Sequence, residues 1–300
     1  MVFTVSGRGA RAVTALAIGA TLLSTTGTAG ASGRAKINPL RVPYSIPLAD
    51  ELLANLRFLP VQFVDASRPT PTTTTTPSSA GTTTPGAPSS ATATTVASHS
   101  RASVTASPVA LLRGHYAWRF ADLPSPFKAN WSVGTLNVIF RGALMRFQAQ
   151  HNLPINGNMD GPTWHALVSA ALRHQVSDET YNVVVVQRAL PQRVWLYRNG
   201  KLSFTSLANT GIAAAPTAPG TYTVYLRYAV TTMSGTLPNG QPYHDTGIPW
   251  TSYFNGGDAL HGFIRSTYGW PQSLGCVEMP FQNAKILWPY TPLGTEVTVE

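Results

Sequence analysis

The chain contains a single cysteine, Cys276, and this residue is the first candidate for chemistry. His261 lies fifteen positions before it, close enough for one loop to bring the two together. A cysteine nucleophile needs a base within hydrogen-bond reach and donors that stabilise the oxyanion formed when a carbonyl is attacked. We predict that Cys276 is the nucleophile and His261 its base. The alternative is an inert, buried thiol.

The residues that flank Cys276 suit a loop that stabilises an oxyanion. Gly275 permits a tight turn and a close backbone approach. The amides of Gly275 and Cys276 could then point together at the developing negative charge. Ser273 is expected to support this loop with a turn-type hydrogen bond, and it is also a weaker candidate for substrate contact.

Four further residues are weaker candidates for substrate binding. Arg265 and Ser266 follow the histidine and could meet a substrate carboxylate, the alternative being a solvated loop. Tyr253 and Phe254 could line a substrate groove, the alternative being burial inside a β domain.

The first thirty-one residues have the pattern of a secretory signal peptide. Arg8 and Arg11 precede an apolar stretch over residues 12–23, and small residues follow up to Ala31. The apolar stretch is shorter than the about 20 residues that a bilayer span needs. We expect cleavage after Ala31 and export to the cell wall or beyond it, the alternative being an uncleaved anchor. In an exported protein an unpaired cysteine favours a reactive thiol or an intermolecular bridge.

The charge balance bears on partners. Twenty-one basic and twelve acidic residues give a net charge of +9, and only 11% of residues are charged. No Lys/Arg run with interleaved aromatic residues is found, which argues against nucleic acid as a partner. Anionic polymers of a cell wall suit the sign of the charge. One cysteine also excludes a cysteine-based zinc finger or iron–sulfur cluster.

From residue 181 onward, apolar residues alternate with a period of two, which predicts a mostly β domain over 181–300, either a sandwich or a partly open barrel. Asn199-Gly200 predicts a hairpin with a type I′ turn. Residues 281–289 are the best candidate for a helix. The predicted strands are Asn182–Gln187, Arg193–Tyr197, Thr221–Tyr228 and Thr295–Val299.

The N-terminal half shows helical spacing on both sides of a low-complexity segment, which predicts a small all-α module. Residues 67–110 are rich in Thr, Ser and Pro, and we expect them to be a flexible, disordered tether. Helical spacing precedes the segment around residues 48–56 and follows it over 139–147, and a third helix is expected from Pro162. The apolar positions are Leu48, Leu52, Leu53 and Leu56, then Ile139, Phe140, Ala143, Leu144 and Phe147, then Trp164, Leu167, Val168 and Ala171.

This helical region resembles a peptidoglycan-binding domain of the three-helix type. The residues that carry the resemblance run from Arg141 to Gln148, then His151-Asn152-Leu153, Asn156-Gly157 and Gly161 to Trp164. The resemblance implies that residues 44–66 are the first helix of that domain, 111–176 its remainder, and 67–110 an insertion within it. The alternative is an ordinary structural bundle.

The residues around the candidate nucleophile resemble the signature of the L,D-transpeptidase catalytic domain, the YkuD-like family. The signature is His-Gly, a loop, and Ser-x-Gly-Cys-Val, here His261-Gly262 and residues 273–277. Many members carry a second histidine directly before Gly-Cys, where this chain has Leu274. Because leucine neither titrates nor donates a hydrogen bond, any role of that histidine is absent here.

The resemblance implies a secreted enzyme that cross-links peptidoglycan. Cys276 and His261 would form a thiolate–imidazolium pair, the Gly262 carbonyl would orient the imidazole, and the amides of residues 274–276 would form the oxyanion hole. The thiol would attack a tetrapeptide stem, and an amine of a second stem would capture the thioester. No metal or organic cofactor is implied. Two alternatives stay open: a thiol carboxypeptidase or other hydrolase, and a non-catalytic wall-binding protein. The sequence leaves the oligomeric state open.

Overall fold

The structure is a computed structural model that describes residues 38–65 and 114–300. The predicted signal peptide (1–31) and the whole of the predicted insertion (67–110) lie outside these ranges. Residues 38–63 and 116–300 belong to one compact unit, and residues 64–65 and 114–115 belong to a second.

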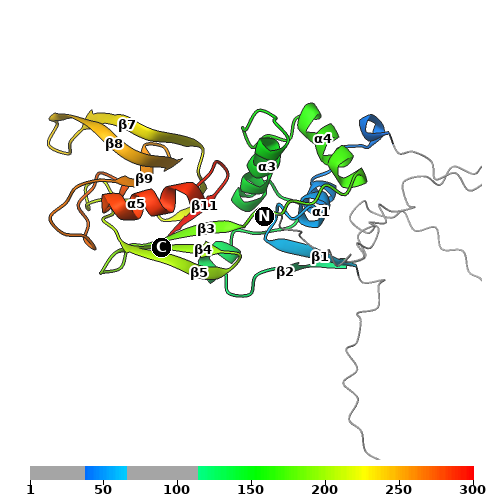
Figure 1. Cartoon of the computed structure of the whole chain (residues 1–300), viewed down its shortest axis with the longest axis horizontal. Coiled ribbons are helices and arrows are strands. Elements are labelled where there is room, and N and C mark those ends of the chain that lie inside the picture. Colours follow the sequence, from blue (N-terminus) through cyan, green and yellow to red (C-terminus); the bar gives the residue numbers. More distant parts are fainter. Residues whose placement is uncertain (1–37, 66–113) are drawn as a thin grey trace, which may run out of the picture. The chain divides into compact units, whose positions relative to one another are not determined.

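The predicted helices are confirmed. A 3-10 turn (Pro39–Arg41) leads into α1 (Ile46–Asn55), and the short α2 (Ser125–Lys128) precedes α3 (Val138–Gln150) and α4 (Gly161–Leu172). Asn137 and Asp160 cap the last two helices by accepting a hydrogen bond from a backbone amide of the first turn. Figure 1 shows α1, α3 and α4 gathered together. Their buried faces share one core that includes Leu52, Leu53, Phe140, Leu144, Phe147, Trp164 and Leu167.

Chain segments on both sides of the low-complexity region contribute to this core. The structure adds two strands that the sequence pattern did not predict, β1 (Val61–Asp65) and β2 (Gly114–Trp118), which pair with each other. They lie at the two ends of the inserted region. The module is therefore not purely helical, which corrects the all-α expectation.

A five-stranded sheet forms the centre of the C-terminal part. Its strands are β3 (Asn182–Gln187), β4 (Arg193–Arg198), β5 (Lys201–Leu207), β6 (Gly220–Thr223) and β11 (Glu296–Val299), in the order β5-β4-β3-β11-β6. The predicted turn between β4 and β5 is confirmed, because Asn199 and Gly200 have φ of 48° and 79°.

Strand β3 explains how the two parts of the chain are joined. Its four consecutive valines are fully buried because both faces of the strand are covered. Val183 and Val185 point into the core of the helices, whereas Val184 and Val186 point into a second core. Successive side chains of a strand point to opposite faces, so one strand serves both cores. The helices and the β domain thus share a buried boundary.

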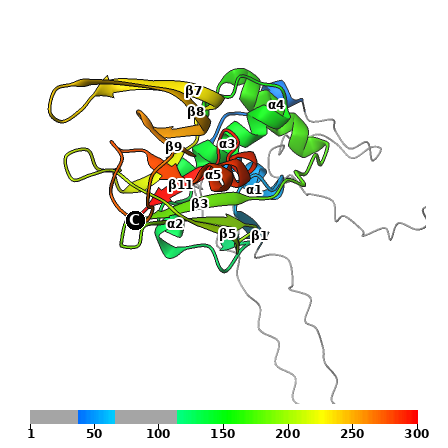
Figure 2. The same cartoon turned by 60° about the vertical axis from the view of Figure 1, so that its left-hand side comes forward.

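The second core lies between the five-stranded sheet and a four-stranded one. The latter consists of β7 (Leu226–Thr236), β8 (Pro242–Asn255), β9 (Asp258–Gly262) and β10 (Val277–Met279), in the order β10-β9-β8-β7. The predicted C-terminal helix is confirmed as α5 (Phe281–Leu287), which is followed by one 3-10 turn, Trp288–Tyr290. Figures 1 and 2 show β7 and β8 as a long hairpin ribbon.

The predicted strand Thr221–Tyr228 is wrong as a single element. The chain changes sheets between Val224, whose amide bonds to Thr295 O, and Tyr225, whose amide bonds to Tyr253 O. The alternation of apolar residues continues across this change, and so it could not reveal that β6 and β7 belong to different sheets.

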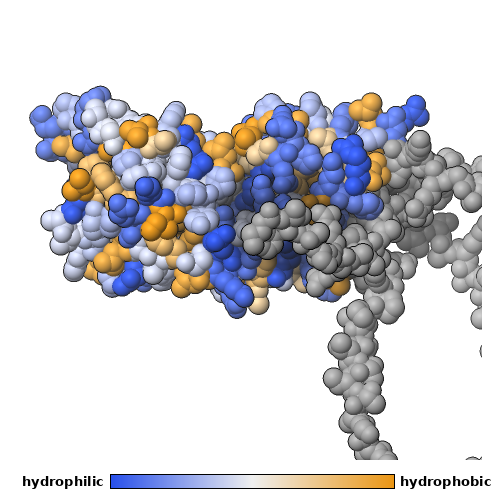
Figure 3. All heavy atoms as spheres, in the orientation of Figure 1, coloured by the Kyte–Doolittle hydropathy of each residue, from blue (hydrophilic) through white to orange (hydrophobic). Residues whose placement is uncertain are grey.

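The described surface is mixed in polarity. On the face drawn in Figure 3, hydrophobic residues are scattered among hydrophilic and near-neutral ones, which fits the small charged fraction of the chain. Within the described ranges, no helix combines the length and the apolar character needed to cross a membrane.

Candidate active site

Two adjacent parallel strands bring the predicted nucleophile and base together. His261 is the penultimate residue of β9, Cys276 lies directly before β10, and the register pairs Glu278 with His261. Both predicted catalytic residues line one cavity of about 1030 Å³. The parallel pairing of β9 with β10 is a tertiary contact, and the spacing of fifteen residues between His261 and Cys276 does not by itself predict it.

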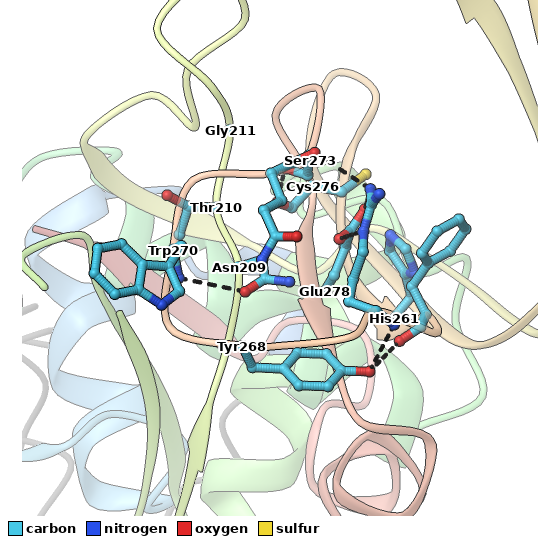
Figure 4. Close-up of polar contacts among 12 residues, drawn as sticks. Asn209, Thr210, Gly211, His261, Tyr268, Trp270, Ser273, Cys276 and Glu278 are labelled. Carbon is cyan, nitrogen blue, oxygen red and sulfur yellow. Dashed lines mark hydrogen bonds and ion pairs between the residues drawn. The ribbon is translucent and has the colours of Figure 1, made fainter. Parts of the chain in front are cut away.

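The loop that carries Cys276 is anchored to residues 209–212, and Figure 4 shows one of these bonds, from Trp270 N to Asn209 Oδ1. The amides of Gln272 and Ser273 donate to Thr210 O at 2.9 and 3.1 Å, and Ile212 N donates to Ser273 O at 2.9 Å. Ser273 is buried, and its hydroxyl donates to Cys276 O at 2.5 Å. Ser273 therefore supports the turn, as expected, and its own hydroxyl is engaged by the loop and not by the cavity.

A buried threonine fixes the peptide group next to the nucleophile. Thr217 Oγ1 donates to Gly275 O at 2.7 Å and accepts from Gly211 N at 2.9 Å. The Gly275 carbonyl belongs to the same peptide group as the Cys276 amide, so this bond sets the direction of that amide. Gly275 has φ of 108°, and a Cβ there would overlap with Asp258 Oδ1, so the position requires glycine.

The amides of the loop are available as oxyanion donors. In the part of the chain that the structure describes, Leu274, Gly275 and Cys276 donate no backbone hydrogen bond to another protein group. Free backbone N–H groups beside a nucleophile are what an oxyanion hole needs.

The imidazole of His261 is held in one orientation. The ring is 2% exposed, and Nδ1 lies 3.0 Å from Gly262 O. Because a carbonyl can only accept, Nδ1 carries the proton in this contact and Nε2 is left with the free electron pair. Gly262 has close neighbours, since a Cβ there would lie 2.9 Å from the Phe281 ring.

The electrostatics of the pair favours two neutral groups in the free site. Burial lowers the pKa of His261, although Gly262 O and the Glu278 charge oppose the shift. Burial raises the pKa of Cys276 from 9.0 to about 12, and the charges of Asp258 and Glu278 act in the same direction. Both pKa shifts oppose the thiolate–imidazolium pair that the resemblance implied. The proton would move to His261 as the thiol attacks.

Comparison with known proteins decides what this site belongs to. The model of the YkuD family, described as the L,D-transpeptidase catalytic domain, matches residues 181–299. This part of the chain is an L,D-transpeptidase catalytic domain. The family acts on peptidoglycan stem peptides and cross-links peptidoglycan. The match begins after α4, so it does not identify the helical part.

The solved structures that match part of this chain include L,D-transpeptidases. An enzyme from Mycobacterium smegmatis is 19% identical (TM-score 0.37), and the alignment covers 40% of this chain and 59% of that one. The catalytic domain of the E. faecium enzyme is 24% identical (TM-score 0.36), with 41% and 98% covered. The enzyme from Stackebrandtia nassauensis is 22% identical (TM-score 0.32), with 57% and 83% covered. No curated protein sequence matches the chain.

Arg265 already has a partner inside the protein. Its side chain lines the cavity, but Nε and Nη2 each donate to a different Glu278 oxygen at 2.8 Å. Nη2 also donates to Gln272 O at 3.2 Å. The charge of Arg265 is therefore neutralised inside the protein, and the residue ties β10 to the cysteine loop.

The aromatic pair of β8 divides between the cavity and the core. Tyr253 lines the cavity, as predicted, whereas Phe254 is 3% exposed and belongs to the core between the sheets. Adjacent strand residues point to opposite faces, so only one of the two could line the cavity. Phe254 does not line the catalytic cavity but does line a second hollow of the same unit. Ser266 is exposed on a loop and does not line the catalytic cavity.

Several site residues were missing from the sequence predictions. Asp245, Asp258 and Glu278 place carboxyl groups at the cavity of the catalytic domain, and Tyr243 lines it from β8. A glutamate between Val277 and Met279 in a buried strand was a signal of a functional or paired charge. Nothing in the sequence distinguished Thr217 from other threonines.

Among the described residues, no three His, Cys, Asp or Glu side chains are grouped so that they could hold a metal ion.

Proposed function

We propose that this chain is a peptidoglycan L,D-transpeptidase that works through a thioester on Cys276. The observation that carries the proposal is the shared cavity, where a thiol, an oriented imidazole and three free amides lie together. These are the three components that nucleophilic acyl transfer requires.

The first half of the reaction acylates the enzyme. Cys276 Sγ attacks the carbonyl carbon before the terminal D-residue of a tetrapeptide stem, and His261 Nε2 takes the thiol proton. The amides of residues 274–276 stabilise the oxyanion. When the C–N bond breaks, His261 returns the proton to the departing amine, and the thioester remains.

The second half transfers the acyl group. An amine of a second stem attacks the thioester, His261 takes a proton from the attacking nitrogen, and the C–S bond breaks to restore the thiol. If water attacks instead, the product is a trimmed stem and the enzyme is a carboxypeptidase.

Location and wall attachment are part of the proposal. The pattern of residues 1–31 supports export, and the resemblance of the helical part supports binding to a wall polymer. The net charge of +9 suits anionic polymers near the enzyme.

The test is incubation of the purified protein with tetrapeptide muropeptides and mass spectrometry of the products. We expect cross-linked dimers from the wild type and none from Cys276→Ala. A carbapenem should add its mass to Cys276, and the alanine variant is the matched control. Trimmed stems without dimers would favour the hydrolase, and a folded protein that forms no adduct would favour the non-catalytic alternative.

A further inference from the structure

A second hollow of about 420 Å³ lies beside the catalytic cavity. It is formed where the start of α3 meets β6 and the turn between β8 and β9. The helical part and the catalytic domain both contribute to it, and neither could form it alone. Its lining includes Asn137, Arg141, Tyr222, Tyr225, Asn255 and Gly256.

The β8–β9 turn is the wall between the second hollow and the catalytic cavity. Gly256 lines the hollow, whereas its neighbour Gly257 lines the cavity, and Gly257 O lies 3.7 Å from Cys276 Sγ. Tyr253 in the cavity and Tyr225 in the hollow have ring centroids 6.5 Å apart. A ligand in the hollow would therefore lie directly across one turn from the nucleophile.

Arg141 supplies the hollow with a cation. In the part of the chain that the structure describes, its guanidinium has no hydrogen bond, ion pair or aromatic ring as a partner, and the side chain is exposed. Its aliphatic stem packs against Gly157 (φ of 68°), where a Cβ would lie 2.7 Å from Arg141 Cγ. The backbone thus leaves room for this arginine, and no Asp or Glu lines the hollow.

The remaining lining is apolar or neutral. Burial and the charge of Asp258 raise the pKa of both Tyr222 and Tyr225, so these phenols stay protonated. The Tyr225 hydroxyl donates to Gly256 O, which holds its half-exposed ring against the turn. The Asp258 carboxyl itself lines the catalytic cavity on the other side of the turn.

We propose that the second hollow binds an acidic peptide, with a carboxylate on Arg141 and apolar groups against the tyrosine rings, and that this peptide is the acceptor of the acyl group. Arginine and carboxylate form charge-assisted, often bidentate hydrogen bonds. A hollow of a few hundred Å³ suits a short peptide segment. This inference rests on the proposed transferase function. It adds that the amine of the acceptor approaches the Cys276 thioester from the side of the second hollow.

The test varies the charge on both partners. The enzyme variant is Arg141→Gln, and Arg173→Gln is the matched control. Arg173 is exposed at the C-terminal end of the helical part, and its guanidinium bonds to Ser169 and Gln175. The acceptor is a synthetic stem peptide with a free amine, made with its carboxylate or with a carboxamide. Dimer formation is measured against acceptor concentration and normalised to the acyl-enzyme in each sample.

We expect Arg141→Gln to raise the apparent KM for the carboxylate acceptor about tenfold, the size of one charge-assisted hydrogen bond. The carboxamide acceptor should show no difference between Arg141→Gln and wild type. A merely structural role of Arg141 would change both acceptors equally, and that result would overturn the proposal.

A binding measurement separates this inference from the proposed function. Calorimetry with Cys276→Ala and the two acceptors should show preference for the carboxylate, and Arg141→Gln in the same background should remove it. Equal binding of the carboxylate and carboxamide acceptors would overturn the inference. So would binding of a muramyl disaccharide without a peptide, if neither acceptor peptide binds. If wild type forms no acyl-enzyme at all but this preference is found, the transferase proposal fails and the acidic-peptide site stands.

Discussion

Two arginine–glutamate pairs hold two different parts of this molecule, and they differ in burial. Arg146 and Glu296 join α3 to β11 through two contacts of 3.1 Å, and their side chains are 9% and 0% exposed. Arg265 and Glu278 join a loop to β10 through two contacts of 2.8 Å, with 30% and 5% exposed. The chemistry is the same, but the surroundings give each pair a different use.

The Arg146–Glu296 pair completes a buried polar network between the helices and the sheet. Arg146 also donates to Gly294 O and Phe58 O, and the Tyr181 hydroxyl donates to Glu296. A Cβ at Gly142 would overlap with Glu296, so the close approach of α3 depends on glycine. None of these residues lines the catalytic cavity, and the consequence of the network is structural.

The Arg265–Glu278 pair positions catalytic groups. Glu278 lies opposite His261 in the β9–β10 register, and Arg265 extends the pair to the cysteine loop through Gln272 O. A charge at this place also acts on the imidazole, because Glu278 raises the pKa of His261 and Arg265 lowers it. The comparison teaches that the buried ion pair stabilises the packing of α3 on the sheet, whereas the partly exposed ion pair holds the cysteine loop in place beside β10.

The largest effect is expected from breaking the fully buried pair. Arg146→Met leaves the Glu296 carboxylate buried without a counter-charge, which should lower the free energy of unfolding by about 3–5 kcal/mol. Chemical denaturation followed by circular dichroism measures the change. The double variant Arg146→Met/Glu296→Met should recover part of the loss, because no charge is then left unpaired. A double variant less stable than the single one would contradict this account.

Removing the negative charge of the Arg265–Glu278 pair should slow acylation of Cys276 more than it lowers the free energy of unfolding. Glu278→Gln weakens the hold of Arg265 on the cysteine loop, and we expect carbapenem acylation of Cys276 to slow by about 10- to 100-fold. Unfolding should become easier by only about 1 kcal/mol, because Arg265 is partly solvated. Glu179→Gln, at an exposed position before β3, is the control. Equal acylation rates in both variants would contradict the positioning role.

The same variant has a predicted pH signature. Glu278 raises the pKa of His261, so its removal should lower that pKa further. Since the imidazole must be neutral to accept the thiol proton, the acid limb of the acylation rate should move to lower pH. Titration of the His261 ring by NMR would test the direction, and a shift to higher pH would refute it.

The smallest effect is expected at Thr217, which belongs to neither pair. Thr217→Val keeps the shape but removes the hydroxyl that fixes the Gly275–Cys276 peptide group, so acylation should slow about tenfold. Thr217→Ser keeps the hydroxyl and should stay within about threefold of wild type. Mass-spectrometric acylation rates on folded protein measure both. Equal loss in the two variants would indicate that packing of the methyl group, and not the hydrogen bond, matters.

Local sequence patterns predicted those elements whose structure depends on near neighbours. The Asn199-Gly200 turn, the valine run of β3 and the helix at Pro162 all follow from backbone preferences or from a short apolar period. The Cys276 loop was predicted for the same reason, because glycine and serine specify a turn at the position where they stand.

Predictions failed where the outcome depended on a distant partner. The alternation over residues 221–228 looked like one strand, but the hydrogen bonds of Val224 and Tyr225 go to different sheets. Phe254 was grouped with Tyr253, but the pleat turns it away from the catalytic cavity, toward the core and the second hollow. The pairing of Arg265 with Glu278, from another strand, could not be predicted either.

The sequence by itself predicted the nucleophile and the base, because a lone cysteine in a Ser-Leu-Gly-Cys turn and a histidine fifteen residues before it are local features. Only the tertiary structure decided the directions in which their pKa values shift, since burial and the charges of Asp258 and Glu278 come from contacts between strands. It also decided that Thr217 orients the loop and that Arg141 reaches a hollow beside the turn. Residue types set what each group can do, and the fold sets which groups meet.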